Sequence, residues 1–156
     1  MKLRLASDDP DVTTQCVIEF GSPVSDEGTW LPYVLALRAG ERELSLSDPA
    51  GGRVEGRCWL GLSPRDELAL LVEGVGDLLA GKRHRWAFEP QEPNFAIDFE
   101  AVSEGYVVHV WLDAGNQLTD HFTWDAVGIR FFTTAQVLER FLMDGRALRA
   151  KVMAEA

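Results

Sequence analysis

The amino-acid sequence predicts a single α+β domain spanning residues 1–156, with antiparallel β-meanders in one strongly bent sheet or two packed sheets and two amphipathic helices packed on them. Short segments of alternating apolar and polar residues, separated by turn sequences, fill the first sixty positions. A second series of this kind runs from residue 94 to 134. Apolar residues at helical spacing follow each series, at 68–79 and 137–152. The pattern therefore predicts two meanders that each end in a helix.

The N-terminal half is predicted to be almost entirely β-structure. Its turns are marked by proline, glycine and aspartate, as at 8–11 and 48–52. Between the turns, successive side chains alternate between two faces, which is the period of a strand. We expect strands at 2–6, 13–20, 33–39, 42–47 and 53–60.

The first helix is predicted to begin at the segment 63–66, Ser-Pro-Arg-Asp. A serine hydroxyl can accept from the free amides of the first turn, and proline suits the first helical position. Gly81 marks the end, because glycine readily adopts the left-handed conformation of a helix C-terminus. The basic residues at 82–85 that follow form either an anion site or a solvated helix end, where cations are favourable.

The stretch 94–134 predicts the central part of the fold. At 95–102 apolar residues alternate with polar ones, so that Asp98 and Glu100 face solvent. Gly105 closes a turn into 106–113, where both faces are largely apolar; we place this strand in the middle of its sheet, covered on each side. A third strand is expected at 117–125, followed by an extended segment at 126–132.

Asp120 conflicts with the pattern of that third strand. Strict alternation directs it inward with Leu118, Phe122 and Trp124. An unpaired buried carboxylate is costly, so Asp120 is either turned outward by a bulge or paired with a donor. This conflict marks Asp120 as a candidate site residue.

The last helix is predicted to have Thr133 or Thr134 as its N-cap, because Thr133 and Gln136 fit the reciprocal capping pattern. Gly145 lies on the apolar side of this helix. Since glycine costs about 1 kcal/mol relative to alanine in a helix interior, we expect either a bend or the close approach of a neighbour's backbone.

The net charge of −10 is unevenly distributed. Residues 6–37 contain six acidic residues, residues 86–129 contain eight, and neither stretch contains lysine or arginine. Such a surface repels phosphate backbones, so we expect no nucleic-acid partner. It attracts a basic protein, although acidic residues retained for solubility explain the same pattern.

Cysteine usage and hydropathy bear on the cellular compartment. Cys16 and Cys58 supply neither a disulfide framework nor a four-cysteine zinc site. They predict buried thiols in a reducing compartment, with a single bridge between them as the alternative. The N-terminus lacks a signal-peptide run, and no stretch approaches the roughly 20 apolar residues of a membrane span. We expect a cytoplasmic protein with no membrane contact and no cofactor or metal.

No nucleophile–base arrangement, phosphate-binding loop, dinucleotide fingerprint or zinc-spaced histidine pair is present in the sequence. His109 and His121 become cross-strand neighbours if the hairpin pairs about Gly115. With Asp98 or Glu100 they would then form a metal or acid–base cluster. A histidine on a half-buried strand is more commonly a hydrogen-bonded wall residue, so we expect no enzymatic activity.

The order of motifs in the C-terminal third resembles that of small bacterial immunity proteins named for the wall-associated toxin WapA. The motifs are an F-x-I-x-F strand at 95–99, a glycine turn at Gly105, a V-x-V-x-L-D strand at 108–113, the aromatic strand end at 122–124, Thr133-Thr134 and the helix from Ala135. The resemblance implies a cytoplasmic protein that neutralises a toxin by binding it, with no catalytic residues.

The leading hypothesis is therefore a non-enzymatic protein that binds a basic toxin through an acidic surface. Its candidate partner-binding residues are Asp98, Glu100, Trp111, Asp120 and Trp124. One alternative is a small-ligand-binding protein or small enzyme with a pocket formed by His109, His121 and a carboxylate. A second alternative is a homo-oligomeric structural protein with an apolar self-complementary patch.

Overall fold

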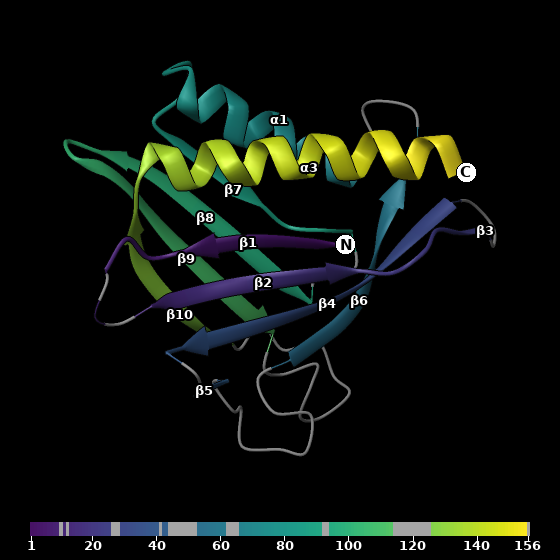
Figure 1. Ribbon diagram of the computed structural model, residues 1–156, viewed down its shortest axis with the longest axis horizontal. Coiled ribbons are helices and arrows are strands. Elements are labelled where there is room, and N and C mark those ends of the chain that lie inside the picture. Colours follow the sequence, from purple (N-terminus) through teal and green to yellow (C-terminus); the bar gives the residue numbers. More distant parts are fainter. Residues whose placement is uncertain are drawn as a thin grey trace.

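The alternating segments of the first sixty residues form the first antiparallel sheet of the computed structural model (Figure 1). The structure describes residues 1–9, 11, 13–25, 29–40, 42–43, 53–61, 66–91, 94–113 and 126–155. Within them, this sheet contains β1 (Lys2–Ala6), β2 (Thr14–Phe20), β3 (Val24–Ser25), β4 (Thr29–Ala39), β5 (Arg42–Glu43) and β6 (Arg53–Leu60). β2 and β3 pair with one edge of β4 while β5 and β6 pair with the other, so the sheet is four strands wide.

The second sheet is a simple meander in the order β7, β8, β9, β10. Its strands are β7 (Arg85–Phe88), β8 (Phe95–Val102), β9 (Gly105–Asp113) and β10 (Ala126–Thr133). All neighbouring pairs are antiparallel. The two halves of the chain thus repeat one plan, a four-strand-wide antiparallel sheet followed by a helix, and the predicted α+β class is confirmed.

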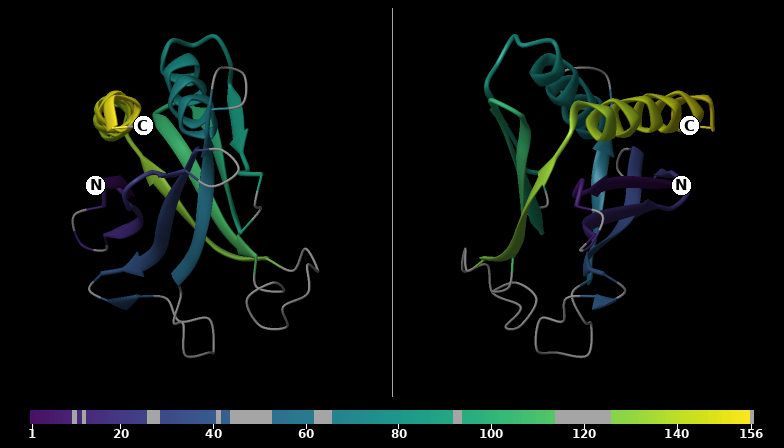
Figure 2. Two further views of the ribbon diagram at one scale, coloured as in Figure 1. Left: turned by 90° about the vertical axis from the view of Figure 1, so that its right-hand side faces the viewer. Right: turned by 60° about the vertical axis from the view of Figure 1, so that its left-hand side comes forward.

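The two described helices, α1 (Glu67–Leu79) and α3 (Ala135–Glu155), lie side by side along one end of the two sheets (Figure 2). They are antiparallel, because Asp66 before α1 contacts Arg149 late in α3 while Val72 faces Gly145. Each helix also contacts the first strand of the other half, α1 against β7 and α3 against β1. Each helix therefore packs on a strand of the half to which it does not belong, and the two helices together join the halves.

The core lies between the inner faces of the sheets and under the helices. Tyr33 on β4 meets Phe95 on β8 edge to face, with ring centroids 5.2 Å apart. One cluster of buried apolar side chains includes residues from both sheets and both helices. Among the described residues, no helix is long and apolar enough to cross a membrane.

Three local predictions were wrong. The strand that follows β9 in the meander and pairs with it is β10, residues 126–133, and not the predicted 117–125, which lies outside the described residues. The N-cap of α1 is Asp66 rather than Ser63; its side chain accepts from the Ala69 amide at 2.8 Å. Of the two threonines predicted to cap α3, Thr133 instead belongs to β10 and donates its hydroxyl to the Ala6 carbonyl at 2.7 Å, which ties the end of β10 to β1. Thr134 is the residue directly before α3, and its carbonyl accepts from the Leu138 amide at 3.2 Å, so that alternative agrees with the structure.

The prediction for Gly81 agrees with the structure, whereas that for Gly145 agrees only in expecting a close neighbour. Gly81 has a φ of 67°, the left-handed conformation expected after a helix. Gly145 is buried, and a Cβ there would lie 2.6 Å from Val72 Cγ2. The close neighbour at Gly145 is thus a side chain of α1 rather than a backbone, and glycine permits the tight packing of the two helices.

Candidate functional site

The β7–β10 sheet has one face in the core and one face that no described residue buries. Strand alternation points Ile97, Phe99 and Val110 inward, each at most 1% exposed. Every side chain on the other face is exposed or half-buried. We call this surface the outer β7–β10 face; it comprises Arg85, Ala87, Ala96, Asp98, Glu100, Val102, Val107, His109, Trp111, Gly128, Arg130 and Phe132.

Strand register arranges these residues in rows across the sheet. One row is Ala87, Asp98, His109 and Arg130, from β7 to β10. The next row is Arg85, Glu100, Val107 and Phe132. Side chains that are directly opposite on paired strands lie within contact distance, so acidic, basic and aromatic groups meet on this face.

Trp111 lies across three strands of the outer face. Its indole Nε1 donates to Asp98 Oδ2 on β8 at 3.0 Å. On the opposite side its ring covers Gly128 on β10, where a Cβ would lie 2.7 Å from the indole Cε3. The His109 ring meets the indole edge to face, with centroids 5.7 Å apart and an interplanar angle of 87°. These contacts hold the indole against the sheet while 38% of the residue stays exposed.

A shallow hollow of about 310 Å³ lies beside Trp111, lined by Asp98, Glu100, Val107, His109 and residues 85–87. Arg85 pairs with Glu100 at its rim, with 3.0 Å between the guanidinium nitrogen and Oε2. Nε2 of His109 is buried and has no hydrogen-bond partner among the described residues. The hollow thus combines two carboxylates with an imidazole and an apolar wall.

Exposed apolar side chains surround the charged residues of this face. Val102 is 41% exposed, Trp111 38% and Phe132 42%. β9 is one of the two inner strands of its sheet, as predicted from its two apolar faces, but only the inner face is covered by described residues. The predicted second layer over the outer face of β9 is thus not found among the described residues.

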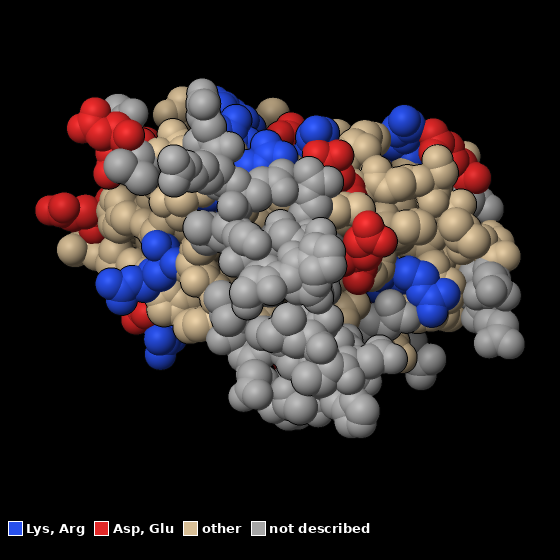
Figure 3. Space-filling view, turned by 90° about the horizontal axis from the view of Figure 1, so that it is seen from below, with Lys and Arg blue, Asp and Glu red and all other residues tan. Residues whose placement is uncertain are grey.

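The charge of the outer face is mixed, in contrast to the acidic surface expected from the sequence. Residues 86–129 contain no basic residue, yet Arg85 and Arg130 lie on the edge strands that flank Asp98 and Glu100. Antiparallel pairing places β7 and β10, at the two ends of the stretch 86–129, beside β8 and β9, which lie within it. Figure 3 likewise shows acidic and basic side chains interspersed on the face seen from below.

The structure brings three of the five predicted partner-binding residues together. Asp98, Glu100 and Trp111 share the outer β7–β10 face. Asp120 and Trp124 lie outside the described residues, as does His121. The alternative in which His109 pairs with His121 is wrong, because His109 lies opposite Asp98 on one side and Arg130 on the other.

Three residues of this face were not identified from the sequence: Gly128, Arg130 and Phe132. The alternation of Val127, Ile129 and Phe131 was the available signal. With Ile129 and Phe131 directed inward, their neighbours must face outward on the same strand. The interruption by Gly128 obscured that signal, although Gly128 is the position that accommodates the Trp111 indole.

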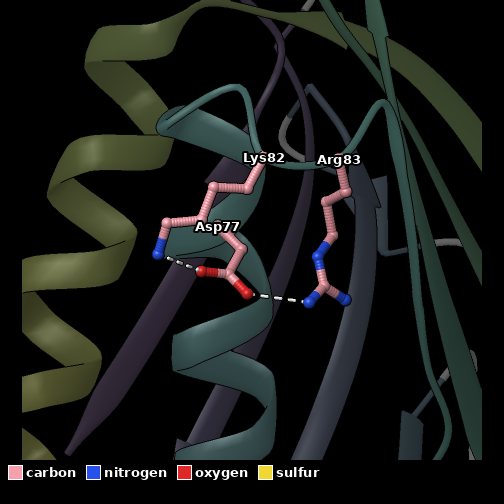
Figure 4. Close-up of polar contacts among 3 residues, drawn as sticks. All are labelled: Asp77, Lys82 and Arg83. Atoms are coloured by element: carbon pink, nitrogen blue, oxygen red, sulfur yellow. Dashed lines mark hydrogen bonds and ion pairs between the residues drawn. The ribbon is translucent and has the colours of Figure 1, made fainter.

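The basic segment 82–85 is a neutralised helix end rather than an anion site. Lys82 Nζ and Arg83 Nη2 both bind the Asp77 carboxylate, at 2.9 and 2.7 Å (Figure 4). The hydrogen bond from Lys82, with a second from Arg83, lowers the pKa of Asp77 despite partial desolvation of the carboxyl. Arg85 is engaged with Glu100. Each of these cations therefore already has a carboxylate partner.

Cys16 and Cys58 form no disulfide, so the alternative of a bridge between them is wrong. Cys16 on β2 pairs with Leu37 of β4, and Cys58 on β6 pairs with Leu31 of β4. The two cysteines therefore lie on opposite sides of β4, at positions six residues apart along that strand.

Among the described residues, no group of three or more histidine, cysteine, aspartate or glutamate side chains is arranged to hold a metal ion.

No protein-family model and no curated protein sequence matches the chain. Among solved structures, it is similar to the plant transcriptional regulator PBF-2, with a TM-score of 0.50 and 11% identity over 99% of this chain and 82% of that one. Trypanosome MRP1/MRP2 aligns with a TM-score of 0.40 and 20% identity, over 96% of this chain and 93% of that one. The likeness to PBF-2 concerns the fold alone.

Proposed function

We propose that this protein is a non-enzymatic binding protein, an immunity-type inhibitor that binds a partner toxin through the outer β7–β10 face. One observation carries the proposal. Exposed apolar side chains and charged side chains gather on a sheet face that no described residue buries. The resemblance of residues 95–148 to the immunity family supplies the class of partner.

The energetics of this face favour association. Trp111 and Phe132 are large and each about two-fifths exposed. Aromatic side chains dominate binding energy when a partner excludes water from them, and a few such residues commonly contribute most of it. Trp111 is also held in place by Asp98 and Gly128, so little conformational entropy is lost when a partner covers it.

The charge of the chain indicates the partner's sign. A net charge of −10 raises the encounter rate with a basic protein and repels phosphate backbones. We therefore propose a basic protein rather than DNA or RNA, even though a transcriptional regulator shares the fold. A common fold supports many functions, and function depends on the site.

The hollow beside Trp111 supports binding better than catalysis. Oδ2 of Asp98 is occupied by the Trp111 indole. Nε2 of His109 has no hydrogen-bond partner in the described part, so it activates no nucleophile there. A general base must lie within hydrogen-bond reach of the group that it deprotonates, and neither Asp98 nor His109 has such a partner at the hollow among the described residues.

The experiment is to purify the chain with the protein encoded beside its gene and to measure binding by calorimetry. We expect a one-to-one complex and protection of cells that express the neighbouring toxin. Trp111→Ala or Phe132→Ala should weaken the complex at least tenfold, because interfacial aromatic residues contribute about 2 kcal/mol or more. Met143→Ala is the control, since Met143 is 69% exposed but lies on α3.

Three results would overturn the proposal. Equal affinity of the Trp111→Ala, Met143→Ala and parent proteins would show that another surface binds the partner. Concentration-dependent self-association lost in Trp111→Ala would assign the face to a second copy of this chain. Tight binding of a single-stranded oligonucleotide at physiological salt would contradict the expected electrostatic repulsion.

A further inference from the structure

We propose that Trp111, Asp98 and the adjoining hollow form an arginine subsite, in which a guanidinium from the partner stacks on the indole and bonds to the carboxylates. The inference rests on the proposed function, because it names the chemistry by which the outer β7–β10 face recognises its partner. The site uses two independent features of the face, a fixed aromatic plane and carboxylate oxygens that bond to no described residue.

The first feature is the open indole face. Three described tryptophans already have an arginine or another ring against them. Arg57 lies 4.6 Å from the centre of the Trp30 ring, and Arg83 lies 4.9 Å from that of Trp86. The third, Trp59, packs on Trp30. No described cation covers Trp111, whose ring is contacted edge to face by His109. A guanidinium from outside can occupy the place that Arg57 and Arg83 occupy elsewhere.

The second feature is the acceptor capacity of the carboxylates. Asp98 has no ion pair with a described residue, and only its Oδ2 is engaged, by the Trp111 indole. Glu100 meets Arg85 through Oε2, but Arg85 is 76% exposed, so solvent screens that pair. Both residues line the hollow, and Oδ1 of Asp98 and Oε1 of Glu100 bond to no described residue.

Arginine fits this arrangement better than lysine or a neutral group. Guanidinium is planar, stacks on aromatic rings and offers a rigid set of donors for carboxylate oxygens. A lysine ammonium is a compact, strongly hydrated charge that cannot stack and bond in the same plane. The side chain of citrulline ends in a neutral urea group, which has the shape of guanidinium without its charge. It therefore lacks both the cation–π attraction and the charge-assisted hydrogen bonds.

The test is a nitrogen–proton correlation spectrum of the isolated protein, which needs no toxin. The indole resonance of Trp111, assigned by its loss in Trp111→Phe, reports on the Asp98 hydrogen bond directly. N-acetyl-arginine methylamide, its lysine analogue and its citrulline analogue are added separately. We expect a saturable shift with arginine, a several-fold weaker affinity for lysine and no saturable shift with citrulline.

Matched variants complete the test. Asp98→Asn retains an acceptor for the indole but removes the charge, and should weaken arginine binding roughly three- to tenfold, as should Glu100→Gln. Glu104→Gln removes the same charge from the exposed β8–β9 turn and should leave binding unchanged. Equal shifts from arginine and citrulline, or equal losses in all three variants, would overturn the subsite.

The two proposals fail separately. If Trp111→Ala abolishes toxin binding while Asp98→Asn and Glu100→Gln bind the toxin with parent affinity, the face is correct and the arginine subsite is wrong. If the isolated protein binds the arginine probe but no variant of the face alters toxin binding, the subsite stands and the proposed function is wrong.

Discussion

Asp66 at the start of α1 is bonded to Arg149 near the end of α3, with 2.9 Å between Oδ2 and Nε. The Asp66 side chain is fully buried, and its other oxygen accepts from the Ala69 amide at 2.8 Å. One carboxylate therefore caps α1 and fixes the antiparallel helix to it. This contact joins residues 83 positions apart and unites the two halves of the chain.

Asp66→Ala should lower the free energy of unfolding by about 1–2 kcal/mol, because loss of an N-cap alone costs about 1 kcal/mol. A double-mutant cycle with Arg149→Gln, measured by urea denaturation, should give a coupling of about 1 kcal/mol. Lys151→Gln is the control: its 3.7 Å contact with Glu155 is exposed and should contribute almost nothing. Strict additivity of Asp66→Ala and Arg149→Gln would contradict the coupling.

Gly145→Ala should destabilise the protein even though alanine is the better helix former. The helical preference favours alanine by about 1 kcal/mol. Its Cβ would, however, lie 2.6 Å from Val72 Cγ2, and overpacking of a core typically costs about 1–3 kcal/mol. We therefore expect a net loss of about 1 kcal/mol in thermal or urea denaturation.

Two comparisons test the cause of that loss. In a Val72→Ala background the obstruction is gone, and Gly145→Ala should become stabilising. Gly76→Ala in α1 should stabilise the parent protein, because its Cβ would meet its nearest neighbours at an ordinary 3.6 Å. A destabilisation of equal size at both glycines would attribute the effect to something other than Val72.

Local sequence patterns predicted most elements of the fold but not all of their pairings. Alternation at 95–102 correctly placed Asp98 and Glu100 on the solvent face, and helical spacing located both helices. The partner of β9 was missed because 117–125 and 126–132 both alternate, and a local pattern cannot select between two candidate strands. Thr133 was misassigned since its hydroxyl had two conceivable uses, and only the fold brings the Ala6 carbonyl within reach.

The candidate site was predicted in part for the same reason. Asp98, Glu100 and Trp111 come from adjacent strands joined by a short turn, so their proximity follows from local alternation. Arg85 and Arg130 lie at opposite ends of the base-free stretch and meet these residues only through the complete meander. Acidic and basic residues that are separated along the sequence are therefore mixed on this face.

Cys16 should make the protein less stable at alkaline pH. Complete burial in the core raises the pKa of its thiol well above the ordinary value of about 9. The folded state thus holds the proton more tightly than the unfolded state. The contribution of Cys16 to stability should be constant below about pH 9 and fall above it, by up to about 1.4 kcal/mol per pH unit.

The measurement is urea denaturation between pH 7 and pH 10.5, roughly the range over which an unfolded thiol ionises. Cys16→Ala should lower the free energy of unfolding at every pH through the lost packing. Above the ordinary thiol pKa, however, its free energy of unfolding should fall less steeply with pH than that of the parent protein. Parallel curves for the two proteins would show that ionisation of Cys16 in the unfolded state is not coupled to folding.

Glu67 should be more important for stability than an acidic residue in a helix usually is. It is 6% exposed, and its two carboxylate oxygens accept from the backbone amides of Trp59 and Gln91, before and after α1. Glu67→Gln keeps the shape but replaces one acceptor oxygen with a donor that faces an N–H group. Leaving a buried amide unsatisfied costs about 1–3 kcal/mol, and we expect a loss of that size in urea denaturation. Glu73→Gln, on the exposed side of the same helix, should change stability by less than about 0.5 kcal/mol, and equal losses at the two positions would contradict the role of the paired amides.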